Sequence, residues 1–185
     1  FNFLLHPMLP SSFYKPSAKI VYSVVVEIEK AGKFSPNKTY QFNFDVVSHV
    51  DLNIEKPELR APLKAEISKS FFMSSKLCSL TAEIPNQAFA AGQDFSVLLS
   101  INNESKQEIT SIILTLLREY KFKCDGISTT SDRDLLISNT QGGLKPQSKH
   151  SATYSFKMPS ALFPTIDSSK CKYIDVTYRL EITAK

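Results

Sequence analysis

The feature that most constrains the fold is an alternation of apolar and polar residues that returns in segment after segment. In residues 20–29 (IVYSVVVEIE) the even positions are all apolar, and the polar residues Ser23, Glu27 and Glu29 fall at odd positions. A period of two places alternate side chains on opposite faces of a strand. The same pattern returns in the stretches 39–47, 78–84, 94–103, 151–158 and 173–184. The alternation therefore predicts an all-β protein.

Turn-forming residues separate these segments and predict hairpins. Gly32, Pro36 and Asn37 lie between the stretches 20–29 and 39–47, and Gly92 lies between 78–84 and 94–103. The stretch 131–150 contains Gly142, Gly143 and Pro146 and is predicted to be a turn-rich loop.

One segment is compatible with two kinds of secondary structure. Residues 108–123 (EITSIILTLLREYKFK) have apolar residues at helical spacing as well as in continuous runs. Their Ile and Thr content, the aromatic end and the strand-rich surroundings favour a buried strand.

A proline-bearing stretch without periodicity divides the alternating segments into two groups. Residues 51–63 (DLNIEKPELRAPL) contain Pro57 and Pro62 with charged residues between them. Proline lacks the backbone donor and has a fixed φ, so this stretch is expected to run extended between packed units. We predict domains at 1–50 and 65–185, with 51–64 as the linker and Pro57 and Pro62 as its interdomain hinge.

Composition and charge exclude several classes of function. The chain has 185 residues, 13 Phe, 7 Tyr and no Trp, and its net charge is +4. Its Lys and Arg are scattered among acids, so no nucleic-acid partner is expected. The densest basic region, residues 15–38, is compatible with peripheral association with acidic lipids or with a phosphorylated tail, although lysines at strand edges also prevent aggregation. No apolar stretch approaches the roughly 20 residues that span a bilayer.

The residues with reactive side chains form no recognisable site. The three histidines, His6, His49 and His150, lie far apart in sequence and have no metal-ligand spacing. No glycine-flanked nucleophilic serine and no phosphate-binding glycine loop is present. We therefore predict no catalytic, cofactor-binding or metal-binding residue, no cofactor and no enzymatic activity.

The cysteines leave one enzymatic alternative open. Cys78, Cys124 and Cys171 are an odd number with wide spacings, which is typical of a reducing compartment. A thiol hydrolase that uses Cys124 or Cys171 with one of the histidines requires the two groups to meet in the fold.

A second alternative is a secreted structural or adhesive β-sandwich. The triplets Asn37-Lys38-Thr39 and Asn103-Glu104-Ser105 have the pattern of N-glycosylation sites. So short a pattern often arises by chance and matters only in a secreted chain.

Two stretches of the sequence resemble the arrestin-domain-containing proteins, the α-arrestins. LPSSFYKPSAKIVYSVVVEIE, followed by FNFDVVSHVDLNIEKPELRAPL, is similar in order and spacing to the junction of the two arrestin domains. CSLTAEIPNQAFAAGQDFSVLLSINNES resembles the start of the C-terminal arrestin domain. The resemblance extends across most of the chain.

The resemblance implies an arrestin-like fold of two immunoglobulin-like β-sandwiches. Residues 1–50 would be the C-terminal strands of an N-terminal arrestin domain whose earlier strands are absent, and 65–185 most of the C-terminal domain. The opening FNFLLHPMLPSSF, which has no initiator Met and no leader, then fits a chain entered partway along a strand.

The resemblance also implies a function and its partners. Such a protein would be a cytoplasmic adaptor, recruited to the plasma membrane or endosomes, that binds receptor or transporter tails and promotes protein transport or endocytic sorting. Ubiquitin ligases would be reached through tail motifs, of the form Pro-Pro-x-Tyr, that this chain lacks. Ala90 follows Phe89 where the thioredoxin-interacting branch has a Cys, so mixed-disulfide capture of thioredoxin is not expected. The resemblance maps no partner-binding residue.

Overall fold

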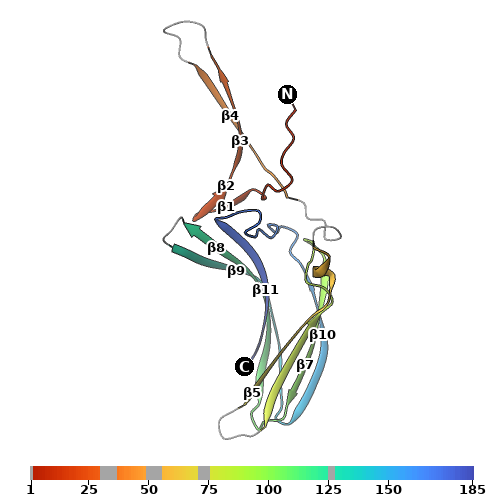
Figure 1. Ribbon diagram of the computed structural model, residues 1–185. Coiled ribbons are helices and arrows are strands. Elements are labelled where there is room, and N and C mark those ends of the chain that lie inside the picture. Colours follow the sequence, from red (N-terminus) through yellow and green to blue (C-terminus); the bar gives the residue numbers. More distant parts are fainter. Residues whose placement is uncertain (1, 30–36, 49–55, 71–75, 125–127) are drawn as a thin grey trace. The chain divides into compact units, whose positions relative to one another are not determined.

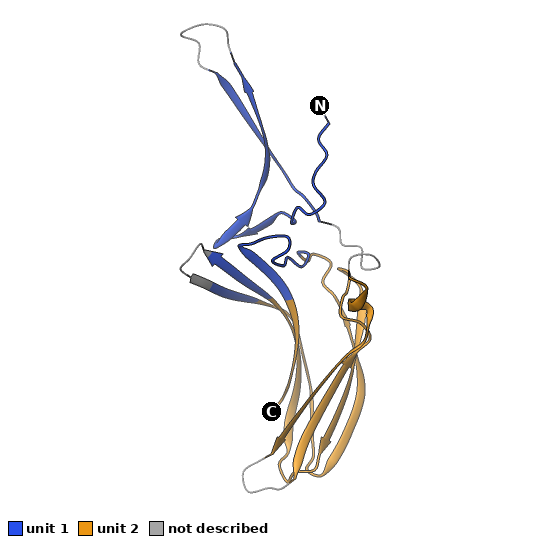
Figure 2. Ribbon diagram, in the orientation of Figure 1, with its two compact units in different colours: residues 1–49, 119–133, 163–177 blue, residues 50–118, 134–162, 178–185 orange. Residues whose placement is uncertain are grey.

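The computed structural model describes residues 2–29, 37–48, 56–70, 76–124 and 128–185, and these residues form strands and one short 3-10 helix (Figure 1). The chain divides into two compact units. Unit 1 contains residues 1–49, 119–133 and 163–177, and unit 2 contains residues 50–118, 134–162 and 178–185 (Figure 2). The all-β prediction is confirmed. No helix in the described ranges is long and apolar enough to cross a membrane.

Unit 2 contains an antiparallel four-stranded sheet in the order β10-β7-β6-β5. Its strands are β5 (Leu63–Ser70), β6 (Leu77–Ile84), β7 (Asp94–Asn103) and β10 (Ser148–Lys157). In the register, Leu99 pairs with Ala82 on one side and Ala152 on the other. The predicted hairpin around Gly92 is confirmed, and Gly92 has the positive φ of 76° that glycine adopts without strain.

A second sheet has the order β11-β8-β9, and its three long strands contribute residues to both units. They are β8 (Ile109–Cys124), β9 (Ser128–Leu144) and β11 (Ile174–Ala184). The strand prediction for residues 108–123 is confirmed by β8, whose Ile and Thr content suits a pleated surface.

The predicted loop at 131–150 is wrong, because β9 occupies most of it. Pairing with β8 supplies backbone hydrogen bonds that outweigh the weak strand propensity of this polar, glycine-containing sequence. Gly143 lies so close to β8 that an added Cβ would be 1.9 Å from the carbonyl oxygen of Ile109. The glycine that indicated a turn is therefore a site of close backbone approach within a strand.

The core of unit 2 is formed where the two sheets face each other. Buried apolar side chains alternate along β7 and are joined by those of β8 and β10. The buried members are Phe95, Val97, Leu99, Ile101, Ile109, Ile112, Leu114, Leu116, Phe156 and Met158.

Unit 1 is organised around an aromatic cluster. Phe13, on β1 (Phe13–Lys15), is fully buried, and its ring centroid lies 5.7 Å from that of Tyr120 and 5.4 Å from that of Phe163. Ring pairs at these separations contribute beyond the area they bury. Ile166, Ile174 and Val176 complete the buried cluster with Tyr120 and Phe122.

Two hairpins belong to unit 1. β1 pairs with β2 (Ala18–Ile20), and β3 (Tyr22–Ile28) pairs with β4 (Lys38–Phe44). The hairpin predicted between 20–29 and 39–47 is confirmed, but its first strand does not include Ile20. That residue ends β2 and pairs with the buried Phe13, so the continuous alternation spans two strands.

The proline-bearing linker is described in part. Residues 51–55 lie outside the described ranges, Pro57 begins the 3-10 helix η1 (Pro57–Arg60), and β5 starts at Leu63. The carbonyl of Leu59 accepts a 2.7 Å hydrogen bond from the amide of Gln87, which ties η1 to the connection after β6. The predicted domain limits and the hinge role of Pro57 and Pro62 stay predictions.

Candidate functional site

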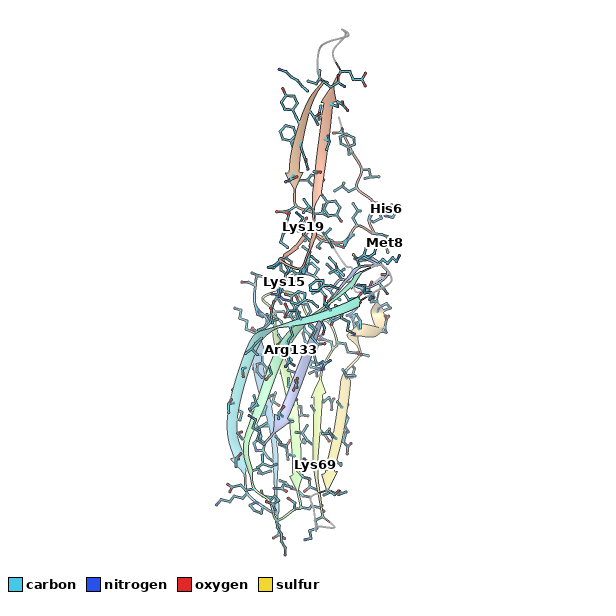
Figure 3. The ribbon with its side chains drawn as sticks, turned by 90° about the vertical axis from the view of Figure 1, so that its left-hand side faces the viewer. His6, Met8, Lys15, Lys19, Lys69 and Arg133 are labelled. Carbon is cyan, nitrogen blue, oxygen red and sulfur yellow. The ribbon has the colours of Figure 1, made fainter. Side chains whose placement is uncertain are left out.

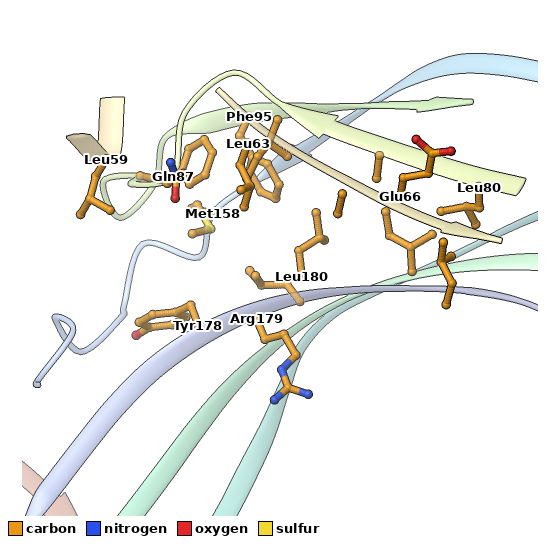
Figure 4. Close-up of a pocket in the computed structure, with 17 residues that line it drawn as sticks. Leu59, Leu63, Glu66, Leu80, Gln87, Phe95, Met158, Tyr178, Arg179 and Leu180 are labelled. Carbon is orange, nitrogen blue, oxygen red and sulfur yellow. The ribbon is translucent and has the colours of Figure 1, made fainter. Parts of the chain in front are cut away.

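Unit 2 contains a groove between β5 and β6 on one side and β11 on the other, which we call the β5–β11 groove (Figure 4). Its volume is about 550 Å³, within the range of binding sites. The lining is mostly apolar: Leu59, Leu63, Ala65, Glu66, Ile67, Leu80, Ala82, Ile84, Gln87, Phe89, Phe95, Leu116, Met158, Tyr178, Arg179, Leu180 and Ile182.

The charged residues of this lining do not point into the groove. Figure 4 shows the carboxylate of Glu66 and the guanidinium of Arg179 directed away from it, while Tyr178 and Leu180 lie on the groove side. This follows from the alternation of side chains along β5 and β11. The groove is therefore suited to apolar groups rather than to a charged substrate.

The groove exists because the two sheets of the sandwich differ in width. Four strands face three, and β5 is the edge strand of the wider sheet. Leu63 and Ile67 lie on the groove face of β5, yet they are 47% and 66% exposed. Apolar side chains left open along an edge strand are typical of an interaction surface.

Tyr178 is one of the polar residues that line the groove. Burial raises the pKa of its phenol, and nearby Asp134 acts in the same direction, while the guanidinium of Arg118 partly offsets the shift. Arg118 forms a 2.7 Å ion pair with Asp134. Because the phenol stays protonated at neutral pH, it can donate a hydrogen bond but cannot serve as a general base.

Cys78 and Cys171 do not form a catalytic pair with the described histidines. Burial raises the pKa of the Cys78 thiol, the opposite of what a nucleophile needs, and Cys171 packs against the aromatic cluster of unit 1. No hydrogen bond joins either thiol to His6 or His150 in the described part of the chain. The side chain of Cys124 lies outside the described residues.

The histidines have other partners. His6 accepts a 3.2 Å hydrogen bond from the amide of Met8, and both residues are labelled in Figure 3. The Nε2 of His150 lies 2.8 Å from the hydroxyl of Tyr154, which follows four residues later on the same face of β10. His49 lies outside the described residues. Within the described ranges, no three His, Cys, Asp or Glu side chains are grouped as metal ligands.

The two candidate glycosylation sites differ in the exposure of their asparagines. The Asn103 side chain is 1% exposed, and its Nδ2 donates a 2.7 Å hydrogen bond to the carbonyl of Gln107. A glycan requires that same nitrogen, so Asn103 is not a glycan acceptor in the folded protein. Asn37 is exposed and donates to Glu27 at 2.8 Å.

The lysine-rich region is only partly available to an anionic surface. Lys15 lies 3.1 Å from Asp132 and packs 4.0 Å from the centre of the Tyr120 ring, while Lys19 is exposed on β2 (Figure 3). Lys30 and Lys33 are outside the described residues.

Sequence reasoning missed the groove because it missed β5. Residues 63–70 (LKAEISKS) have small or charged residues between Leu63 and Ile67, and they follow the proline-bearing linker. The alternation of Leu63, Ala65 and Ile67 was a usable but weak signal for this edge strand.

Comparison with known proteins extends the picture from fold to family. The chain is 30% identical over 128 residues to arrestin domain-containing protein 1 of Rattus norvegicus and of Mus musculus, and 29% identical to that of Homo sapiens. Each alignment covers 66% of this chain but only 29% of the relative, so the chain spans less than a third of their length. The family described as "Arrestin (or S-antigen), C-terminal domain" matches residues 74–185, more than half of the chain. The four-on-three sandwich of unit 2 is built largely from these residues, and the chain belongs to the arrestin family.

Proposed function

We propose that this chain is part of an arrestin-like adaptor, a protein that binds membrane cargo and trafficking or ubiquitination machinery and promotes protein transport or endocytic sorting. The observation that carries the proposal is the match of residues 74–185 to the C-terminal arrestin domain. That region provides β6, β11 and most of the other lining of an open apolar groove, a kind of surface that suits protein binding.

The partners of this adaptor would be the cytoplasmic tails of receptors or transporters, with ubiquitin ligases reached through other parts of the protein. Its work would be done in the cytoplasm, at the plasma membrane or at endosomes. Residues 1–50 and 65–185 would belong to separate arrestin domains, and the segment around Pro57 and Pro62 would act as their hinge. Neither catalysis nor a cofactor is part of this proposal.

Proximity labelling with the intact gene product tests the adaptor function. We expect receptors, transporters or ubiquitin ligases among the labelled proteins, at higher yield than with a control in which Leu99→Asp disrupts the core of the sandwich. Labelling dominated by extracellular matrix proteins would contradict the adaptor role.

The alternative, a secreted adhesive sandwich, has one of its two supports removed by the burial of Asn103. Asn37 stays open to modification. Mass spectrometry of the native protein distinguishes the two functions, because unmodified Asn37 together with reduced cysteines is expected only of the adaptor.

A further inference from the structure

The connection from β10 to β11, residues 158–173, lies outside the strands for most of its length. Its sixteen residues contain one isolated bridge, from Ile166 to Val176. Connections longer than about 12–15 residues without secondary structure are uncommon, and they are usually functional or disordered. This one is ordered, because Ile166 is 1% exposed and belongs to the aromatic cluster of unit 1.

A tight turn follows Ile166 and is closed through Asp167. The Asp167 carbonyl accepts hydrogen bonds from the amides of Lys170 and Cys171, at 3.0 and 2.9 Å. Its Oδ1 accepts from the amide of Ser169 at 3.0 Å and also from the hydroxyl of that serine. An aspartate that bonds to groups two residues later is a common way of fixing a turn. The Ser169 hydroxyl therefore helps to hold the turn closed.

The turn also ties the connection to a segment far away in the sequence. The Nζ of Lys170 donates a 2.8 Å hydrogen bond to the Oγ of Ser48, and the Ser48 amide donates one of 2.8 Å to the Oγ of Ser11. Ser11 is 3% exposed, so this series of contacts ends in the interior of unit 1. Ser48 lies shortly before the proline-bearing stretch 51–63. Lys170 therefore anchors the segment that leads into the predicted hinge.

Ser169 is exposed although its hydroxyl bonds to Asp167. Its neighbour Ser168 is exposed as well, whereas Asp167 and Lys170 are half-buried. An enzyme can therefore reach the hydroxyl, while the groups that it affects lie deeper in the unit. Lys170 and Lys172 follow Ser169 at the first and third positions. Kinases distinguish substrates partly by charge pattern, and these lysines suit a kinase with an acidic substrate groove.

We propose that Ser169 is a phosphorylation site whose modification opens this turn. A serine/threonine protein kinase transfers the γ-phosphoryl group of ATP to the Ser169 Oγ. A new O–P bond forms, the bond from the γ-phosphorus to the β–γ bridging oxygen breaks, ADP leaves, and the hydroxyl proton is released to solvent. The added group carries a charge of about −1.5 to −2 at pH 7.

The phosphate changes both contacts of the turn. The hydroxyl donor to Asp167 is lost, and the phosphate repels the neighbouring Asp167 carboxylate. The phosphate also competes with the Ser48 hydroxyl for the ammonium of Lys170, because charge-assisted hydrogen bonds are roughly twice as strong as neutral ones. Both effects open the turn and break the contact between Lys170 and Ser48. Phosphorylation thereby releases the segment that leads into the predicted hinge.

This inference goes beyond the adaptor function, because it names a modification and its structural effect, and its tests require no cargo protein. Labelling of receptors or transporters in a protein without phosphate on Ser169 would reject the switch and leave the adaptor role intact. Phosphate on Ser169 without such labelling would do the reverse.

Phosphopeptide mapping tests whether the site is used. The intact gene product is purified with phosphatase inhibitors from the cells that express it. We expect phosphate on Ser169 and little on the exposed neighbour Ser168. The absence of phosphate from Ser169, or its presence on Ser168 alone, would overturn the assignment.

Phosphoserine incorporated at position 169 of the intact gene product tests the structural effect. We expect hydrogen exchange at the amides of Lys170 and Cys171 to accelerate about tenfold or more, because both donate to Asp167 in the closed turn. Phosphoserine at position 168 is the matched control, since it adds the same charge and leaves the Ser169 hydroxyl in place. It should change the exchange by less than about threefold.

The variant Asp167→Asn separates repulsion from a general loss of structure. Its side chain keeps the acceptor oxygen and carries no charge, so phosphoserine at 169 should accelerate exchange far less than with Asp167. The Lys123 amide, which donates to Tyr173 at 2.8 Å, should stay protected in every form and shows that unit 1 remains folded. Equal acceleration by phosphate at either serine would overturn the proposal. Unchanged exchange, or equal acceleration with Asp167 and with Asp167→Asn, would also overturn it.

Discussion

Gly143 is a residue at which adding a Cβ atom should strongly destabilise the fold. An added Cβ would lie 1.9 Å from the carbonyl oxygen of Ile109 and 2.7 Å from that of Thr110, and both are backbone atoms that cannot rotate away. We expect Gly143→Ala to lower the free energy of unfolding by about 2 kcal/mol or more. Gly142→Ala is the control, because its Cβ would meet nothing within 4 Å, and a change within about 0.5 kcal/mol is expected. Equal effects in urea denaturation would contradict the close approach.

Asn103 closes the end of β7 through a buried network. Its Oδ1 accepts from the amide and hydroxyl of Ser105, and its Nδ2 donates to Gln107. Because the alanine variant leaves buried donors and acceptors unsatisfied, we expect Asn103→Ala to cost about 2–3 kcal/mol of unfolding free energy. Asn102→Ala, which removes only a surface bond to Glu104, should cost far less. Similar midpoints in chemical denaturation would refute this role.

Two partly buried acids, the Cys78 thiol and the Tyr178 phenol, make the fold sensitive to high pH. Burial raises the pKa of Cys78 above 9.0 and that of Tyr178 above 10.0 in the folded state. A raised folded pKa means that stability is complete below the unfolded pKa and is lost as pH rises through the folded pKa. We expect wild-type stability to fall above about pH 9.

The double variant Cys78→Ala with Tyr178→Phe tests that assignment. Its stability should decline less steeply than that of the wild type between about pH 9 and 11, because the two groups with raised folded-state pKa values are gone. Thermal midpoints measured across this range give the slope, and an unchanged slope would assign the alkaline sensitivity to other groups.

At the scale of elements, β7 shows how one strand stabilises the sandwich on one face only. Leu99 is fully buried between the sheets, whereas its neighbour Leu98 is 43% exposed. We expect Leu99→Ala to lower the free energy of unfolding by about 2–5 kcal/mol and Leu98→Ala by about 0.5 kcal/mol or less. The two variants remove the same atoms, so their difference in guanidinium denaturation measures the position alone.

The alternation of apolar and polar residues in the sequence predicted those strands that bury one face and expose the other. β7 and β11 were predicted from period two, and β8 from its β-branched residues despite its helical spacing. β9 was not predicted, because its polar, glycine-containing sequence has little strand propensity of its own and depends on pairing with β8. The break between β2 and β3 escaped prediction because both sides of it alternate in the same phase.

At the scale of the whole molecule, the two units have separate hydrophobic clusters that share no residue. Phe13 is central to the cluster of unit 1 and is fully buried. We expect Phe13→Ala to cost about 3–5 kcal/mol and to increase hydrogen exchange in unit 1 while β7 stays protected. Tyr14→Ala, at an exposed neighbour bonded to Asp45, is the control. Equal loss of protection in β7 would show one cooperative core.

The family could be inferred from the sequence, whereas the candidate site could not. The arrestin resemblance depended on the order of strands, turns and prolines, which a linear pattern retains, and the family match confirms it. The groove depends on two edge strands, β5 and β11, that lie far apart in sequence. Leu63 and Ile67 are exposed because the two sheets differ in width. This is a property of the assembled sandwich, so the sequence alone does not reveal it.

The alternation along β11 also determines which mutations this strand can accept. Successive residues of a strand point their side chains to opposite faces. Substituting Leu180 therefore changes the contacts of one side chain and leaves the direction of all the others unchanged. Inserting one residue before Tyr178 would instead turn every later side chain over, exposing Leu180 and Ile182 and burying Arg179 and Glu181. Among homologous sequences, insertions and deletions in β11 should therefore be far rarer than substitutions, and those that occur should involve two residues.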